Sequence, residues 1–259
     1  MIAVIGDIHG CYNTLVALYS RIIEKYPNID IYSIGDLVDR GNFSRDVVNF
    51  IIQKKIKLCP GNHDYMFYHF FKDPTSVFAR SWFFNGNEPT LESYENFETD
   101  MFTHIEFIKT AQLFYNLDDC FISHAGISKK YEKYLPKDFH NDLSLLDSFI
   151  QNDLRSDRGI LWTRDPLLNI GKLQIVGHTT KPEITLVEDS NAVYIDTGVF
   201  LGNKLSAVII NNNEIVETFE ERTHMEDIIK KWKYLPSFID IISLTYSQAF
   251  EQQLLSLWL

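Results

Sequence analysis

The sequence predicts an α/β (α+β) fold in which two mixed β-sheets are flanked by helices. Short apolar runs alternate with amphipathic segments from Ile2 to about Leu58, and this order is typical of parallel strands joined by helices. Closely spaced apolar runs return after Cys120, which indicates a second group of strands. With 259 residues, 45% of them hydrophobic, the chain is long enough to bury one large core.

The first elements follow from the spacing of apolar residues. Residues 2–5 ("IAVI") are apolar, mostly β-branched and followed by glycine, which predicts a strand buried on both faces. From Tyr12 onward, Leu15, Leu18 and Ile22 recur at helical spacing until "YPN" ends the pattern. A strand followed by a helix is therefore expected at the start of the chain.

The same order then repeats. The run "IDIYSI" predicts a second strand, Ser44 can cap a helix that runs to Lys55, and "IKLC" predicts a third strand. Residues 65–117 are rich in aromatic side chains, with helical periodicity in part, and we expect a helical insertion without a strand there.

The later strands are marked by apolar runs at 120–123 and 173–176, each leading into a polar loop. Three further runs between 192 and 220, with a hairpin turn at "NNN", predict a second sheet that is antiparallel or mixed. We expect one main domain over residues 1–222. Residues 223–259 predict a helical C-terminal extension that packs on the body or forms an oligomer or partner surface.

Composition narrows the class of protein. A net charge of −11 disfavours nucleic acid and anionic membranes as partners. Three scattered cysteines are too few for a disulfide framework, and no apolar run approaches the length of a membrane span. We therefore expect a soluble cytoplasmic protein.

Polar residues of metal-binding types follow the predicted strands. Carboxylates mixed with neutral imidazoles suit manganese first, with iron, zinc, cobalt or magnesium as alternatives. We predict two divalent ions bridged by Asp36. One ion is expected to be bound by Asp7, His9 and Asp36, and the other by Asp36, Asn62, His124 and His178.

Three further residues are expected to act on a phosphate ester. His63 adjoins a metal ligand but points elsewhere in an extended loop, so it is the candidate general acid, with Asp39 keeping it charged. The planar fork of Arg40 suits phosphate oxygens.

These motifs resemble the phosphoprotein-phosphatase family of metallophosphoesterases. The matching segments are "GDIHG", "GDLVDRG", "GNHD", "SHAG" and "VGHT", and "SWFFNGNEPT", "GILWTRDP" and "VYIDTG" point to the bacteriophage lambda-type and small bacterial branch. The resemblance implies a calcineurin-like β-sandwich flanked by helices. It also implies attack by a metal-bridging hydroxide without a phosphoenzyme, which makes Cys11 structural rather than a nucleophile. By the same resemblance, Arg164 is a second phosphate-binding residue, Asn85 lies in a loop over the site, and Asp196 is a supporting or turn-forming residue.

The expected activity is that of a metallophosphatase acting on serine/threonine phosphoproteins and small phosphoesters. The alternative is a symmetrical dinucleoside tetraphosphate hydrolase, because Asp64 replaces the glutamate of the protein phosphatases and the aromatic residues of 67–84 could stack a base. Core packing is the other interpretation of those aromatic residues. Asp39, which the symmetrical hydrolases usually lack, favours the phosphatase branch. A binding module without catalysis is disfavoured, since every expected ligand is present.

Overall fold

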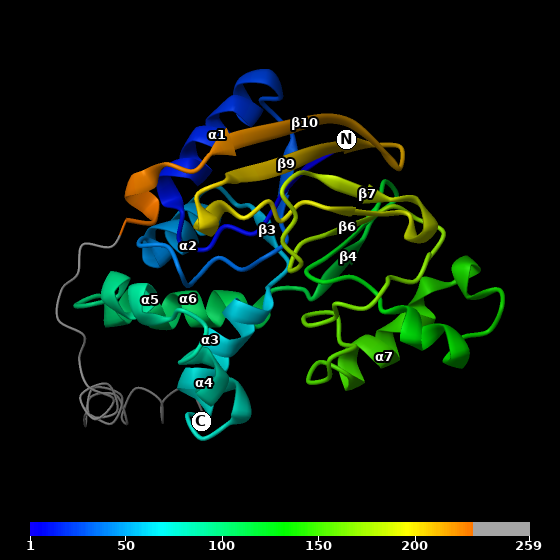
Figure 1. Cartoon of the computed structure of the whole chain (residues 1–259), viewed down its shortest axis with the longest axis horizontal. Helices are drawn as coiled ribbons and strands as arrows, with labels where there is room; N and C mark the ends of the chain where they lie inside the picture. Colours follow the sequence, from blue (N-terminus) through cyan, green and yellow to red (C-terminus); the bar gives the residue numbers. More distant parts are fainter. Residues whose placement is uncertain (230–259) are drawn as a thin grey trace.

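The computed structural model describes residues 1–229 and contains two mixed five-stranded sheets (Figure 1). The first sheet has the spatial order β10 (Glu214–Arg222), β9 (Lys204–Asn211), β1 (Ile2–Ile5), β2 (Asp30–Ser33) and β3 (Lys57–Leu58). The second has the order β4 (Phe114–Asn116), β5 (Phe121–Ser123), β6 (Gln174–Val176), β8 (Ala192–Tyr194) and β7 (Thr185–Val187). The predicted fold class is confirmed.

Alternating side chains of β1 contribute to two separate cores. Val4 of β1 packs with Ile122 of β5 and Ile175 of β6 in the layer between the sheets. Ala3 and Ile5 point the other way, against the helices. A strand that is buried on both faces in this way requires the nearly continuous apolar run that the sequence shows.

Helices cover the outer faces of both sheets (Figure 1). The helices of the structure are α1 (Tyr12–Lys25), α2 (Ser44–Gln53), α3 (Asn62–Lys72), α4 (Val77–Trp82), α5 (Glu88–Ser93), α6 (Glu98–Thr110) and α7 (Asp147–Asn152). Short 3₁₀ turns are η1 (Lys129–Tyr134), η2 (Phe139–Asn141), η3 (Leu143–Leu146), η4 (Glu188–Ser190), η5 (Val199–Leu201) and η6 (Met225–Asp227).

The structure places two strands in a different sheet from the one expected. Strands β9 and β10 join the first sheet, because β9 pairs antiparallel with β1, with Ile2 opposite Ile210 and Ile5 opposite Ala207. Residues 205–210 of β9 are all buried, with one set of side chains between the sheets and the other against the helices. Local patterns predict the hairpin of β9 and β10. They do not predict that β9 pairs with β1, which lies about 200 residues earlier in the chain.

Two local expectations are also corrected. The segment 65–117 is helical up to Thr110, but it ends in strand β4, a half-exposed edge of three residues with little periodic signal. Ser44 is the first residue of α2 and does not cap it; the N-cap is Phe43. The Ser44 hydroxyl instead accepts the backbone N–H of Asp39, with an N···O distance of 3.2 Å.

The first residues of the predicted C-terminal extension hold the start of α1. The buried Asp227 carboxylate accepts the backbone N–H groups of Asn13 and Thr14, at 3.0 and 2.9 Å. It therefore supplies the helix cap that Cys11, the residue at the N-cap position, does not provide. The remainder of the predicted extension, residues 230–259, lies outside the described residues. Among the helices of residues 1–229, none is long and apolar enough to cross a membrane.

Candidate metal centre and general acid

The ends of five strands bring the predicted ligands together. Asp7 follows β1, Asp36 follows β2, Asn62 begins α3 just after β3, His124 follows β5 and His178 follows β6. Two groups of candidate ligand atoms lie within 4.8 Å of one another: His9, Asp36 and His63, and Asp7, Asp36 and His124. Asp36 belongs to both groups, as a bridging ligand must. Asp7 thus converges with His124 as well as with Asp36, and the division of ligands between the two ions stays a prediction.

The loops that carry these residues are strained. His9, Asp36 and His178 adopt positive φ angles of 46°, 49° and 62°, a region that costs a non-glycine residue about 1 kcal/mol or more. Glycines make room for the carboxylates, since a Cβ atom on Gly61 would lie 2.1 Å from Oδ1 of Asp36 and one on Gly177 would lie 1.9 Å from Oδ1 of Asp7. Strain and close approach at one place are typical of a functional site.

The imidazoles of His124 and His178 each direct a nitrogen lone pair at the side-chain oxygen of Asn62. Nδ1 of His124 lies 2.8 Å from the carbonyl oxygen of Ile34, which can only accept, so the ring proton is on Nδ1. Its other nitrogen then directs a lone pair at Oδ1 of Asn62, 2.9 Å away. His178 repeats the arrangement, with Nε2 on the carbonyl oxygen of Trp162 at 3.1 Å and Nδ1 2.9 Å from the same Asn62 oxygen. Acceptors that converge in this way fit a cation between them.

Buried carboxylates at the centre add to this fit. Oδ1 of Asp7 is buried and has no hydrogen-bond partner among the described residues. Burial, with the nearby Asp196 and Asp36 carboxylates, raises the pKa of Asp7 well above its usual value. Burial would also raise the pKa of Asp36, but electrostatic interactions with His124, His63, His9 and Arg40 outweigh burial and hold this pKa below its usual range. Since buried charge requires a counter-charge, the donor set fits divalent metal ions.

His63 and Asp39 form a buried pair beside these ligands. Nδ1 of His63 lies 2.6 Å from Oδ2 of Asp39, and the two side chains are 2% and 0% exposed. Burial by itself would lower the pKa of His63, but the carboxylates of Asp36 and Asp39 outweigh that effect, and the pKa is raised. The two carboxylates thus favour the charged form of His63 that a proton donor requires, whereas the neighbouring Arg40 guanidinium opposes it.

Arg40 bridges the two imidazoles of the site. Its Nη1 and Nη2 atoms lie 2.9 Å from Nε2 of His9 and 2.9 Å from Nε2 of His63, and its guanidinium lies 4.1 Å from the centre of the Phe200 ring. The backbone N–H of Arg40 donates to the carbonyl oxygen of Gly86, at 2.8 Å. The fork of this half-exposed arginine is therefore held over the ligand cluster.

The three residues implied by the resemblance are placed as follows. The exposed Arg164 lies beside the site, with Nη1 3.5 Å from the carbonyl oxygen of His178. Asn85 lies in the α4–α5 loop next to Arg40, but its amide donates to the carbonyl oxygen of Ser81. Asp196 accepts the Thr180 hydroxyl at 2.6 Å and the backbone N–H of Gly198 at 3.0 Å, so it supports a turn.

Sequence reasoning assigned no catalytic role to the Asp64 carboxylate, and the structure shows what it holds. Its two oxygens accept the backbone N–H groups of Leu37 and Gly61, both at 2.9 Å, and it is fully buried. Asp64 therefore ties two ligand loops together and does not reach substrate. The N-terminal position in α3, as a partner in a capping box, was the signal that could have shown this.

Other neighbours of the site were also missed. Trp82 and Thr90 donate to Asp39, and both lie in the quoted segment "SWFFNGNEPT", which was the available signal. The Phe200 ring packs edge-on against His9, with ring centres 4.9 Å apart, and no motif pointed to it. Burial raises the pKa of the Cys11 thiol, in keeping with a structural role.

The aromatic residues of 67–84 are mostly core residues. Phe67 and Trp82 are fully buried, and Phe70 and Phe78 are nearly so, whereas Phe84 is 89% exposed. The interpretation as core packing is therefore confirmed for these four residues, and Phe84 is left as a largely exposed aromatic side chain.

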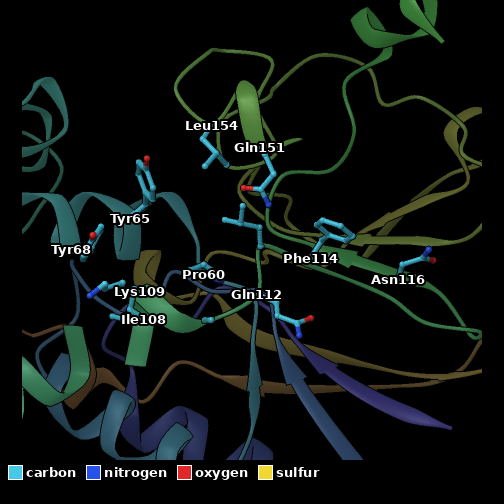
Figure 2. A pocket seen from close by; sticks show the side chains of 12 residues that line it. Pro60, Tyr65, Tyr68, Ile108, Lys109, Gln112, Phe114, Asn116, Gln151 and Leu154 are labelled. Carbon is cyan, nitrogen blue, oxygen red and sulfur yellow. The ribbon is translucent and has the colours of Figure 1, made fainter. Parts of the chain in front are cut away.

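A pocket of about 520 Å³ lies between α3, α6 and β4. Figure 2 shows Tyr65 and Tyr68 of α3 on one side, and Phe114 of β4 on another. Among the described residues its lining includes none of the predicted metal ligands. The candidate catalytic groups are thus outside this pocket.

Comparison with known proteins agrees with the geometry. The curated relatives include an enzyme of Anoxybacillus flavithermus named bis(5'-nucleosyl)-tetraphosphatase PrpE (asymmetrical), which is 29% identical over 232 residues, 79% of this chain and 88% of the relative. A symmetrical bis(5'-nucleosyl)-tetraphosphatase of Salmonella paratyphi A is 43% identical, but over 63 residues, 23% of this chain and 22% of the relative. A protein serine/threonine phosphatase structure from Saccharomyces cerevisiae has a TM-score of 0.54 at 17% identity, over 86% of this chain and 80% of that one, which shows a shared fold.

The sequence pattern of the calcineurin-like phosphoesterases matches residues 1–208, a range that ends within β9 and contains all of the second sheet, β1 to β3 of the first sheet and every candidate ligand. The chain belongs to the calcineurin-like phosphoesterase family and is a phosphoric ester hydrolase.

Proposed function

We propose that this metallophosphoesterase is a phosphomonoesterase that acts on phosphate esters of alcohols, including phosphoserine and phosphothreonine in proteins. The observation that carries the proposal is the 2.6 Å contact between Nδ1 of His63 and the buried Asp39 carboxylate. An alkoxide is a poor leaving group unless it is protonated as its bond to phosphorus breaks. A proton donor held in place by Asp39 therefore favours phosphate esters of alcohols as substrates.

Six residues would hold the metal ions: Asp7, His9, Asp36, Asn62, His124 and His178. Two divalent ions, of which manganese is the first candidate, would supply Lewis acidity toward the phosphoryl group and activate the attacking water. The residues that carry out this activity lie within 1–222, the domain that we assign to it.

His63 would supply the proton of the reaction. With Nδ1–H held by Asp39, protonated His63 donates from Nε2 to the leaving oxygen. That Nε2 atom now lies 2.9 Å from Nη2 of Arg40, so the guanidinium must turn toward the phosphate oxygens when substrate binds. Arg164, on the His178 side, would bind a further phosphate oxygen.

A second candidate is asymmetrical cleavage of dinucleoside tetraphosphates, into a nucleoside triphosphate and a monophosphate. It is supported by the name of the Anoxybacillus flavithermus relative, which matches this chain over 88% of its own length. Symmetrical cleavage has weaker support, since the symmetrical enzyme of Salmonella paratyphi A matches this chain over only 22% of its own length. Asp64, which suggested it, is turned toward the backbone of two loops.

A substrate panel distinguishes these candidates. Purified protein is assayed with manganese, with magnesium and with chelator on 4-nitrophenyl phosphate, a phosphoserine peptide and diadenosine tetraphosphate, and products are separated by chromatography. We expect manganese-dependent phosphate release from the peptide. Cleavage of the tetraphosphate into triphosphate and monophosphate, with the peptide intact, would support the second candidate, and no hydrolysis of any substrate would overturn both.

A further inference from the structure

Trp82 of α4 and Thr90 of α5 both donate to the carboxylate that holds His63. The indole Nε1–H of Trp82 lies 2.8 Å from Oδ2 and 3.0 Å from Oδ1 of Asp39, and the Thr90 hydroxyl lies 2.8 Å from Oδ1. We propose that Trp82 and Thr90 are positioning residues of the general acid, through which the helical insertion aligns His63 for proton donation. This inference rests on the proposed role of His63.

The three donors fix the plane of the carboxyl group. Oδ1 of Asp39 receives Thr90 and Trp82, whereas Oδ2 receives Trp82 and His63. Because Trp82 donates to both oxygens and Thr90 donates to Oδ1, rotation of the carboxyl group would break at least one of these hydrogen bonds. Oδ2 is thereby kept facing Nδ1 of His63.

Thr90 also fixes the backbone of the residue that it orients. The backbone N–H of Asp39 donates to Oγ1 of Thr90 at 2.8 Å, while the same hydroxyl donates its proton to Oδ1. Asp39 has a φ angle of 73°, where a non-glycine residue is strained, so it requires such support. One threonine thus holds both ends of Asp39.

The two donors are themselves immobilised. Trp82 and Thr90 are fully buried, and the Trp82 ring packs against Phe67 and Phe70, with ring centres 5.4 and 4.9 Å apart. A buried carboxylate without partners would be costly, and these donors compensate it. The helical insertion, residues 65–117, contains neither Asp39 nor any of the predicted metal ligands. Through Trp82 and Thr90 it would nevertheless contribute to proton transfer.

Two substitutions test the proposal. Thr90→Val removes the hydroxyl at nearly constant volume, and the Asp39 N–H keeps the Ser44 hydroxyl as a partner at 3.2 Å. Trp82→Phe removes the indole N–H and keeps a ring. Thr90→Ser is the conservative rescue, and Ser93→Ala is the matched control, because Ser93 lies on the same helix and its hydroxyl donates to the carbonyl oxygen of Thr90 instead of to Asp39.

The readout is the ratio of kcat on a phosphoserine peptide to kcat on 4-nitrophenyl phosphate, whose leaving group needs little protonation. Loss of a hydrogen bond to a charged group is worth about tenfold in rate, so we expect about a tenfold lower ratio for Thr90→Val and for Trp82→Phe. Thr90→Ser should restore it, and Ser93→Ala should leave it unchanged. In a His63→Asn background, Thr90→Val should have no further effect on the ratio.

A proton NMR spectrum gives a second, activity-independent readout. The proton shared by His63 and Asp39 should give a strongly downfield resonance in the wild type and in Ser93→Ala, and this resonance should shift or vanish in Thr90→Val and Trp82→Phe. An unchanged resonance, or equal loss of rate on both substrates, would contradict positioning. If His63→Asn itself leaves the ratio intact, the role proposed for His63 fails instead.

Discussion

Nδ1 of His63 lies 2.6 Å from Oδ2 of Asp39, although one residue belongs to α3 and the other to the loop between β2 and α2. The pair lies beside Asp36, which belongs to both groups of candidate metal ligands. A proton donor and a cation site are thus held in one buried cluster by the ends of neighbouring strands.

Asp36→Asn should abolish metal binding. Asp36 belongs to both ligand groups, so the loss of its charge weakens the binding of both ions. In the wild type, free manganese at a hundred times its Kd should stabilise the fold by about 2.7 kcal/mol, and chelator should remove that gain. Thermal melting with and without manganese, together with metal content, measures this. The control is Asp157→Asn, at a side chain that is 83% exposed; a manganese shift retained in Asp36→Asn would refute the assignment.

Arg40→Lys should lower kcat/KM for phosphate esters by about tenfold or more, because a lysine keeps the charge but loses the planar fork. Phe200→Leu should have a smaller effect in the same direction, since its ring lies 4.1 Å from the guanidinium. Steady-state kinetics measure both. Arg80→Lys, an exposed position on α4, serves as the control; equal values for Arg40→Lys and wild type would exclude the phosphate role.

Stability should fall in acid partly through His104. Its Nδ1 accepts from the Tyr94 hydroxyl at 2.7 Å, its Nε2 lies 3.1 Å from Oδ1 of Asn49, and burial lowers the pKa of His104 to about 4. Between the unfolded-state pKa of about 6.5 and this value, the unfolded chain binds a proton that the fold does not, so stability is lost as the pH falls.

Urea unfolding of wild type and His104→Gln from pH 8 to pH 4 measures this contribution. At pH 8 the two proteins differ by the hydrogen bonds of the imidazole and by its packing against Tyr94, neither of which involves a charged His104. The stability advantage of the wild type should then shrink as the pH drops through the window between about 6.5 and about 4. An advantage that is constant over this range would mean that His104 titrates alike in both states.

Asp227→Asn should destabilise the protein by about 2 kcal/mol, because the amide cannot accept all the donors that the buried carboxylate accepts at the start of α1. Chemical denaturation provides the value. Glu226→Gln removes the same charge from an exposed neighbour in η6 and should be nearly neutral. Equal effects of the two substitutions would show that net charge, not capping, is responsible.

The sequence predicted what local patterns encode. Asp7 and Asp36 follow the parallel strands β1 and β2, and His124 and His178 follow the parallel strands β5 and β6, so each pair could be predicted to share one sheet edge. That the edges of the two sheets meet is a contact that the local patterns do not contain. Other contacts between distant segments could not be predicted either. Trp82 and Thr90 reach Asp39 because the insertion folds back over the β2 loop, and no periodicity reports that approach.

The sheet assignment of β9 illustrates the same limit. Its apolar run predicts a strand buried on both faces, but two sheets offered suitable edges. The register that pairs Ile2 with Ile210 depends on the whole assembly of both cores. The cap from Asp227 to Thr14 is likewise a contact between residues 213 positions apart, which local signals do not contain.

The most direct test of the account compares wild type with His63→Asn in manganese, on a phosphoserine peptide and on 4-nitrophenyl phosphate. Because general acid catalysis contributes about a hundredfold or more, we predict a loss of kcat of that size on the peptide and a much smaller loss on the aryl ester. Equal losses on the two substrates, or none, would contradict the role of His63 as the proton donor.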